Sequence, residues 1–222
     1  MNTKVKICCI SSITEAKLAV SYGATALGLV SQMPSGPGVI SDEKILEIIE
    51  TIPDKIDTFL LTSETDSEKI ILQQKKFKPK TLQLVDEVKT DVYTDIKSEL
   101  PGINIVQVVH VTDKSSIDYA VRVSEFADVI LLDSGNPGLS VKELGGTGRV
   151  HNWNISRKIR DSVKVPVYLA GGLNPENVRE AIETVGPYGV DLCSGVRTNG
   201  KLDKVKLKNF FDVVFNRILN ID

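Results

Sequence analysis

A cysteine and an aspartate stand at the ends of two apolar segments and could act together as an acid–base pair. Cys8 lies near the end of the segment KVKICCI (4–10), and Asp133 closes the segment ADVILLD (127–133). Alternation along the first segment predicts Lys6 and Cys8 on one face and Ile7 and Cys9 on the other. A thiol and a carboxyl group that face one small substrate can remove one proton and donate another. Two other interpretations stay open, because cysteine is common as a small buried hydrophobic residue and Asp133 could cap the following loop.

Glycine-bearing turns follow three of the later segments. One is GGTG (145–148), another is Gly171-Gly172 after VPVYLA (165–170), and the third is Ser194-Gly195 after GVDLC. Glycine has no Cβ, so main-chain N–H groups at such turns can come close to an anion. Purely structural turns are the alternative interpretation. The candidate anion-binding residues are Gly146, Gly148, Gly171, Gly172, Ser194 and Gly195.

The elements that would position these residues are eight short apolar segments separated by amphipathic stretches. Each segment is apolar on both faces, as expected for a strand that is buried on both sides of a parallel sheet. The stretches between them carry apolar residues at helical spacing, most weakly at about 88–99 and 154–161. The predicted strands are 4–10, 26–30, 56–62, 81–85, 103–111, 127–133, 165–170 and 189–194.

Eight such βα units fill the chain from 1 to 222 and leave no room for a second domain. The sequence therefore predicts a single-domain α/β fold, a (β/α)₈ TIM barrel with a parallel sheet that has no open edge. An open doubly wound sheet is less favoured, because no G-x-G-x-x-G turn follows the first segment. In such barrels the strand ends carry the chemistry, and the loops after strands seven and eight often hold a phosphate.

Composition excludes several classes of function. The chain has 222 residues, 41% of them hydrophobic, and a net charge of −2, so no basic field attracts nucleic acid. No apolar run approaches the roughly 20 residues of a membrane span. Three cysteines and two distant histidines give neither a disulfide framework nor a metal site. We expect a cytoplasmic protein without metal or cofactor, monomeric or homodimeric, with no membrane or nucleic-acid partner.

These motifs resemble those of the phosphoribosylanthranilate isomerase family of tryptophan biosynthesis. The resemblance rests on KIC (6–8), LLD (131–133), GGTG (145–148), LAGGLNPENV (169–178) and SGV (194–196), in order along the chain. Trp153 and NGKLD (199–203) add to it. The resemblance implies a cofactor-free (β/α)₈ enzyme that performs an Amadori rearrangement of N-(5′-phosphoribosyl)anthranilate.

The resemblance also implies roles for the two candidate residues. Asp133 would be the general acid that protonates the ring oxygen of the sugar, and Cys8 the general base that removes the C2′ proton. A free thiol is only slightly ionised at neutral pH, and a nearby cation such as Lys6 could lower its pKa. A structural ion pair inside the barrel is the other role open to Lys6.

The sequence departs from the family pattern where the anthranilate would bind. The loop SQMPSGPGVIS (31–41) has no cation where the family carries an arginine for the anthranilate carboxylate. Gln83-Leu84-Val85-Asp86 stands where the family has Gln-Leu-His-Gly, Cys9 replaces a glycine, and Arg197 replaces a glutamate. Lys6, Gln83, His110 and Arg197 are the candidate substrate-binding residues, and Arg149 is a further possible source of positive charge.

Two alternatives to this isomerase activity follow from the altered loop. The chain could act on a different phosphorylated sugar, or it could be a barrel that binds a phosphorylated ligand without catalysis. The presence of both Cys8 and Asp133 argues against the second alternative, because a site without catalysis has no physical need for that pair.

Overall fold

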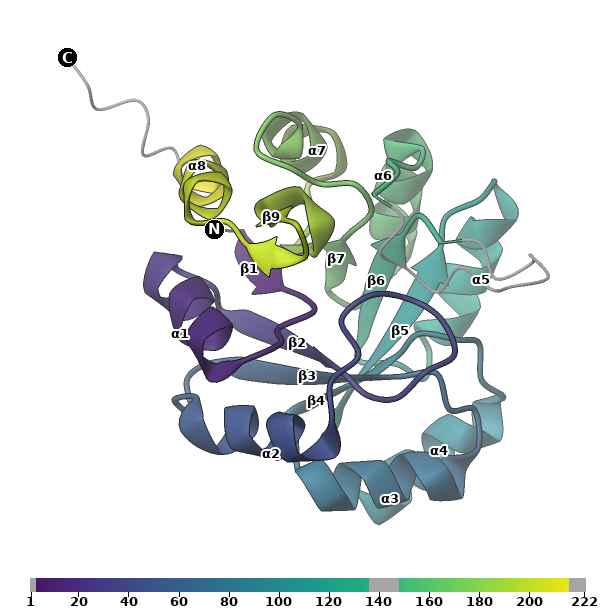
Figure 1. Ribbon diagram of the computed structural model, residues 1–222. Coiled ribbons are helices and arrows are strands. Elements are labelled where there is room, and N and C mark those ends of the chain that lie inside the picture. Colours follow the sequence, from purple (N-terminus) through teal and green to yellow (C-terminus); the bar gives the residue numbers. More distant parts are fainter. Residues whose placement is uncertain (1–2, 136–147, 216–222) are drawn as a thin grey trace.

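The computed structural model describes residues 3–135 and 148–215, and its eight main strands close into a parallel barrel (Figure 1). Each strand pairs with the next in the chain, and β1 pairs with β8, so the sheet has no free edge. All eight predicted strands are confirmed, most of them shorter than predicted. They are β1 Lys4–Ile7, β2 Ala26–Val30, β3 Asp57–Thr62, β4 Thr81–Leu84, β5 Asn104–His110, β6 Val129–Asp133, β7 Val167–Leu169 and β8 Gly189–Leu192.

Helices surround the barrel on the outside, one after each strand (Figure 1). The two weakly predicted helices are present as α4 and α6. In the described part of the chain, no helix combines the length and the apolar character that crossing a bilayer requires. The helices are α1 Ile13–Tyr22, α2 Asp42–Thr51, α3 Ser67–Phe77, α4 Thr90–Glu99, α5 Ser115–Val123, α6 Trp153–Ser162, α7 Val178–Val185 and α8 Lys204–Val214.

Buried side chains form two separate cores, as the two faces of the strands require. The larger core lies between the sheet and the helices and contains residues such as Ile7 and Leu29. The smaller core contains Cys8, Phe59 and Leu131 and fills the barrel interior. Its side chains alternate along each strand with those of the outer core. Cys8 and Asp133 therefore lie on the inner face of the barrel, at the carboxyl ends of its strands.

The prediction from strand alternation is correct for Cys8 and wrong for Cys9. Alternation places Lys6 and Cys8 on one face and Ile7 with Cys9 on the other. β1 ends at Ile7, however, and Cys9 has a left-handed backbone with φ of 59°. This conformation turns the Cys9 side chain into the inner core beside Cys8. Regular alternation applies only while the backbone stays extended.

A nearly buried ion pair holds the segment that follows β1. Arg197 lies in β9 (Arg197–Thr198), directly after the short 3₁₀ helix η1 (Ser194–Val196), and its Nη1 is 2.9 Å from Glu15 Oε1. Arg197 Nη2 also donates to the carbonyl oxygens of Cys8 and Cys9, at 3.2 and 2.7 Å. Glu15 accepts from the main-chain N–H groups of Ser11 and Leu202. The pair therefore fastens the end of β1 to the loop after β8.

Replacing Arg197 by alanine should destabilise the fold, because Glu15 would keep a nearly buried charge without its partner. We expect Arg197→Ala to lower the free energy of unfolding by about 3 kcal/mol, measured by urea denaturation. Arg157 is the matched control, since its ion pair with Asp161 is about half exposed, and Arg157→Ala should cost less than about 1 kcal/mol. Equal effects of the two substitutions would contradict the fastening role of Arg197.

Candidate active site

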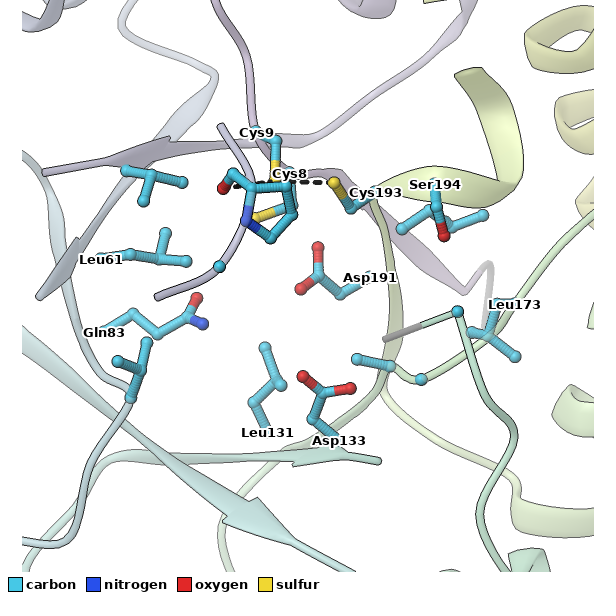
Figure 2. Close-up of a pocket in the computed structure, with 18 of the residues that line it drawn as sticks. Cys8, Cys9, Leu61, Gln83, Leu131, Asp133, Leu173, Asp191, Cys193 and Ser194 are labelled. Carbon is cyan, nitrogen blue, oxygen red and sulfur yellow. Dashed lines mark hydrogen bonds between the residues drawn. The ribbon is translucent and has the colours of Figure 1, made fainter. Parts of the chain in front are cut away.

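The candidate site is a pocket at the carboxyl end of the barrel strands (Figure 2). Cys8, directly after β1, and Asp133, the last residue of β6, both line it, and these strands are not neighbours in the barrel. The side chains of Gln83, Asp133 and Asp191 are directed into one space (Figure 2). The sequence therefore correctly predicts that Cys8 and Asp133 share a cavity.

Lys6 and Asp191 form a buried ion pair, in which Asp191 lines the pocket and Lys6 lies beneath it. Lys6 Nζ lies 2.9 Å from Asp191 Oδ2, and the two side chains are 0% and 8% exposed. Lys6 Nζ and Cys8 Sγ both lie against Gly28, where a Cβ would be 3.1 Å from the nitrogen and 2.7 Å from the sulfur. A side chain on Gly28 would displace both groups. Gly28 therefore gives the cation room beside the thiol.

The surroundings shift the pKa values of the candidate base and acid in useful directions. Hydrogen bonding with the Cys9 thiol lowers the pKa of Cys8, and the charge of Lys6 adds to this effect against the opposing effect of burial. Burial raises the pKa of Asp133, although Ser134 N–H donates to its Oδ1 at 2.7 Å. A thiolate at Cys8 and a protonated Asp133 suit a base and an acid.

Gly148 and two of the glycine turns, Gly171-Gly172 and Ser194-Gly195, converge at one side of the pocket. Gly171 and Gly172 are left-handed, with φ of 80° and 64°. A Cβ on Gly172 would lie 2.6 Å from the main chain of Arg149, and one on Gly195 would lie 1.9 Å from the carbonyl oxygen of Leu173. Glycine is therefore needed at these positions for the loops to pack on one another. Loop packing is a structural role, and it also brings the main chains of these turns together.

The converging turns leave unused main-chain donors. In residues 3–135 and 148–215, no hydrogen bond uses the N–H of Gly171, Gly172, Ser194 or Gly195. Gly171, Gly172 and Ser194 line the pocket, as does Gly148, while Gly195 lies just behind Ser194. Gly146 lies outside the described residues. Several unpaired N–H groups in neighbouring turns are the arrangement that binds a phosphate.

Three of the four candidate substrate-binding residues do not line the pocket. Lys6 is fully buried beneath it, in the ion pair that the sequence left open as its other role. Arg197 is held by Glu15, and His110 Nε2 lies 3.2 Å from the carbonyl oxygen of Val85. Arg149 is exposed and also lies outside the lining. The geometry thus gives no support to substrate contacts of Arg197 or His110.

Gln83 is the candidate substrate-binding residue that does line the pocket. It is 3% exposed, and its Oε1 has no hydrogen-bond partner within the described residues. The neighbouring walls are apolar and include Val30, Met33, Leu61 and Val85. No lysine or arginine is among the described residues of the lining. A neutral amide in apolar surroundings is suited to orient one polar group of an otherwise flat, apolar ligand part.

Sequence reasoning missed two residues of the site, Asp191 and Cys193. Asp191 lines the pocket beside Cys8 and Asp133, and its only signal in the sequence is a carboxylate inside the otherwise apolar strand β8. Cys193 also lines the pocket, with its sulfur 2.7 Å from that of Cys9. The two cysteines are 184 residues apart in the sequence, and only barrel closure brings them together.

Known proteins of one family are similar to this chain. The family model described as N-(5′phosphoribosyl)anthranilate (PRA) isomerase matches residues 5–213. N-(5′-phosphoribosyl)anthranilate isomerase 1 of Methanosarcina mazei is 34% identical over 228 aligned residues, which cover 96% of this chain and 95% of the relative. The corresponding isomerase of Haloferax volcanii is also 34% identical, over 89% of this chain and 86% of the relative.

Solved structures of such isomerases share the fold. Phosphoribosyl anthranilate isomerase from Thermotoga maritima superposes with a TM-score of 0.83 at 31% identity, covering 96% of this chain and 99% of the other. A complex of such an isomerase with reduced 1-(o-carboxyphenylamino)-1-deoxyribulose 5-phosphate has a TM-score of 0.80 at 29% identity, with the same coverage. Fold, pocket and sequence agree, and the chain belongs to the N-(5′-phosphoribosyl)anthranilate isomerase family.

Proposed function

We propose that this chain converts N-(5′-phosphoribosyl)anthranilate to 1-(2-carboxyphenylamino)-1-deoxyribulose 5-phosphate, with Cys8 as general base and Asp133 as general acid. The observation that carries the proposal is that Cys8, Asp133 and the converged glycine turns line one pocket. The curated relatives named for this isomerase support the reaction. The roles of base and acid follow from the family resemblance, and the directions of the two pKa shifts support them.

In the first step, Asp133 opens the furanose ring. Its proton is transferred to the ring oxygen, the C1′–O bond breaks, and the nitrogen lone pair forms a protonated Schiff base with C1′. A carboxyl group must be protonated to do this, and burial raises the pKa of Asp133 accordingly. After the transfer, Asp133 carries a negative charge that faces the pocket.

In the second step, the Cys8 thiolate removes the proton from C2′. The electrons of the C–H bond form a C1′–C2′ double bond, which neutralises the Schiff base and gives an enolamine. The enolamine then tautomerises to the ketone at C2′. The cation of Lys6 and the Cys9 thiol stabilise the thiolate before the transfer.

The phosphate anchors the substrate in this mechanism. The unused N–H groups of Gly171, Gly172, Ser194 and Gly195 supply donors on the side of the pocket formed by the loops after β7 and β8. A phosphate held there fixes the sugar carbons relative to the strand ends, which is worth several kcal/mol in such reactions. Binding energy from this remote group therefore serves the chemistry at C1′ and C2′.

The anthranilate ring would lie against the apolar wall, with Gln83 as the donor for its carboxylate. The Gln83 side chain ends in the pocket, and no described lining residue offers a positive charge. A neutral donor holds a carboxylate less tightly than an arginine does. The absence of a positive charge among the described lining residues also favours a second candidate function. This function is the isomerisation of another phosphorylated sugar amine, one whose substituent has no carboxylate.

Two of the structural neighbours show a ligand and an assembly state for their own proteins. One neighbour holds a phosphorylated ligand, and another is described as a monomer generated from a dimeric isomerase. A monomeric or homodimeric state, a cytoplasmic location and the absence of a cofactor stay predictions for this chain.

The acid and base roles can be tested by single substitutions. Cys8→Ser and Asp133→Asn should each lower kcat by about 10²–10⁴-fold, with a much smaller change in KM, because each group acts on a proton and not on binding. The assay follows the loss of phosphoribosylanthranilate fluorescence. Asp54→Asn, which alters an exposed carboxylate at the other end of the barrel, is the control. Full activity of either site variant would refute its assigned role.

The role of Gln83 can be tested with two substrates. Gln83→Leu removes the donor but keeps the size, so it should raise KM for phosphoribosylanthranilate about tenfold, as expected for one lost hydrogen bond to a charged group. With the phosphoribosyl derivative of aniline, which has no carboxylate, the substitution should change KM less than twofold. An equal rise with both substrates would contradict carboxylate recognition. If the wild-type protein converts the aniline derivative but not phosphoribosylanthranilate, the second candidate function is favoured.

A further inference from the structure

Two cysteines outside the proposed acid–base pair face each other at the mouth of the pocket. Cys9 Sγ and Cys193 Sγ are 2.7 Å apart, and both residues are free thiols in this structure (Figure 2). Cys9 is 7% exposed, whereas Cys193 is partly exposed. Both line the pocket, so a small reagent that enters the pocket can reach them.

The backbone around these residues suits a bond between them. In the parallel pairing of β1 with β8, Ile7 lies opposite Leu192, so Cys8 continues this register opposite Cys193 and Cys9 lies one residue further on. The sulfurs of Cys9 and Cys193 nevertheless lie 2.7 Å apart, so a small movement brings them to the S–S length of about 2.05 Å of a disulfide. The left-handed backbone of Cys9 turns its sulfur toward Cys193, which follows β8, whereas regular alternation would place it on the outer face of the barrel.

A backbone conformation that L-residues rarely adopt is a reason to look for a function of the side chain. Cys9 is packed tightly in this conformation, since a Cβ on Gly38 would lie 2.5 Å from Cys9 Cβ. Its thiol also donates to the carbonyl oxygen of Pro37 at 3.6 Å. Cys9 therefore contacts both β8, through Cys193, and the loop 31–41 that forms one wall of the pocket.

We propose that Cys9 and Cys193 form a reversible disulfide in exchange with low-molecular-weight disulfides, and that this bond lowers the activity of the site. The more accessible Cys193, as thiolate, attacks the small disulfide RSSR, which forms a mixed disulfide and releases RS⁻. Cys9 then attacks the Cys193 sulfur and releases the second RS⁻. Two protein thiols are oxidised, RSSR is reduced to two RSH, and the two thiol protons end on these products.

The effect on activity passes through Cys8 and therefore rests on the proposed function. Cys8 and Cys9 are neighbours in the chain and both line the pocket, so a bond that fixes Cys9 to Cys193 also constrains the position of the Cys8 thiol. A disulfide has no S–H, so oxidation also removes the hydrogen bond from Cys9 to the Pro37 carbonyl oxygen, which is a contact with the loop 31–41. We expect a several-fold loss of kcat in the oxidised protein.

The bond itself can be tested without any activity measurement. The protein is incubated with oxidised glutathione, unfolded, treated with an alkylating reagent and mapped by mass spectrometry. We expect two of the three cysteines to be protected, with a Cys9–Cys193 linked peptide and an alkylated Cys8. Dithiothreitol should restore three alkylated cysteines. Three alkylated cysteines after oxidation, a stable mixed disulfide with glutathione, or a bond that includes Cys8 would each overturn the proposal.

Single substitutions provide matched controls. Cys8→Ser should still form the bond and leave no alkylated cysteine, whereas Cys193→Ser should keep both of its remaining thiols. Bond formation in Cys193→Ser would show that Cys8 and Cys9 pair with each other, against the proposal.

The effect on activity is tested by assaying the wild type and Cys193→Ser before and after treatment with oxidised glutathione. Only the wild type should lose activity, and dithiothreitol should restore it. A wild type with a mapped Cys9–Cys193 bond and undiminished activity would overturn the regulatory part alone. An absence of isomerase activity in the reduced protein would instead refute the proposed function and leave the bond intact as a finding.

Discussion

The buried ion pair between Lys6 and Asp191 is the interaction on which the rest of the site depends. Neither charge could be buried in the barrel alone, because an unpaired buried ion carries a penalty of several kcal/mol. At 2.9 Å, Asp191 raises the pKa of Lys6 above its ordinary value despite the opposing effect of burial. The pair also joins β1 to β8, the strands that close the barrel.

This pair acts on both proposed catalytic groups. In addition to the hydrogen bond with Cys9, the charge of Lys6 lowers the pKa of Cys8, and the charge of Asp191 raises it by less. For Asp133, burial raises the pKa most, the charge of Asp191 adds to this effect, and the charge of Lys6 opposes it by less. The pKa of Cys8 is thus shifted down and that of Asp133 up, which are the directions that suit a base and an acid. Position in the barrel, rather than residue type alone, separates their roles.

The sequence was sufficient to predict the barrel and the pairing of Cys8 with Asp133 in one pocket. Apolar segments buried on both faces and strand ends at one side of a barrel are local signals that need no knowledge of distant contacts. The glycine turns were predicted for the same reason, but their packing on one another was not. Gly172 and Gly195 lack a Cβ because neighbouring loops touch them, which a linear pattern does not reveal.

One error is a local effect of the backbone, and the other two concern contacts between residues far apart in the chain. Alternation misplaced Cys9, because a single left-handed residue ends the extended backbone. Arg197 was a candidate for the substrate because its partner Glu15, 182 residues away, had no visible connection to it. Asp191 was missed because a carboxylate within an apolar strand has a meaning only once Lys6 lies opposite. For Arg197 and Asp191, the partner is known only once the barrel is closed.

The most direct test of the account is a crystal structure of this protein with reduced 1-(o-carboxyphenylamino)-1-deoxyribulose 5-phosphate. The account predicts the phosphate among the N–H groups of Gly171, Gly172, Ser194 and Gly195, with C2′ about 3.5 Å from Cys8 Sγ. A phosphate bound away from these turns, or a sugar whose C2′ faces neither Cys8 nor Asp133, would contradict it.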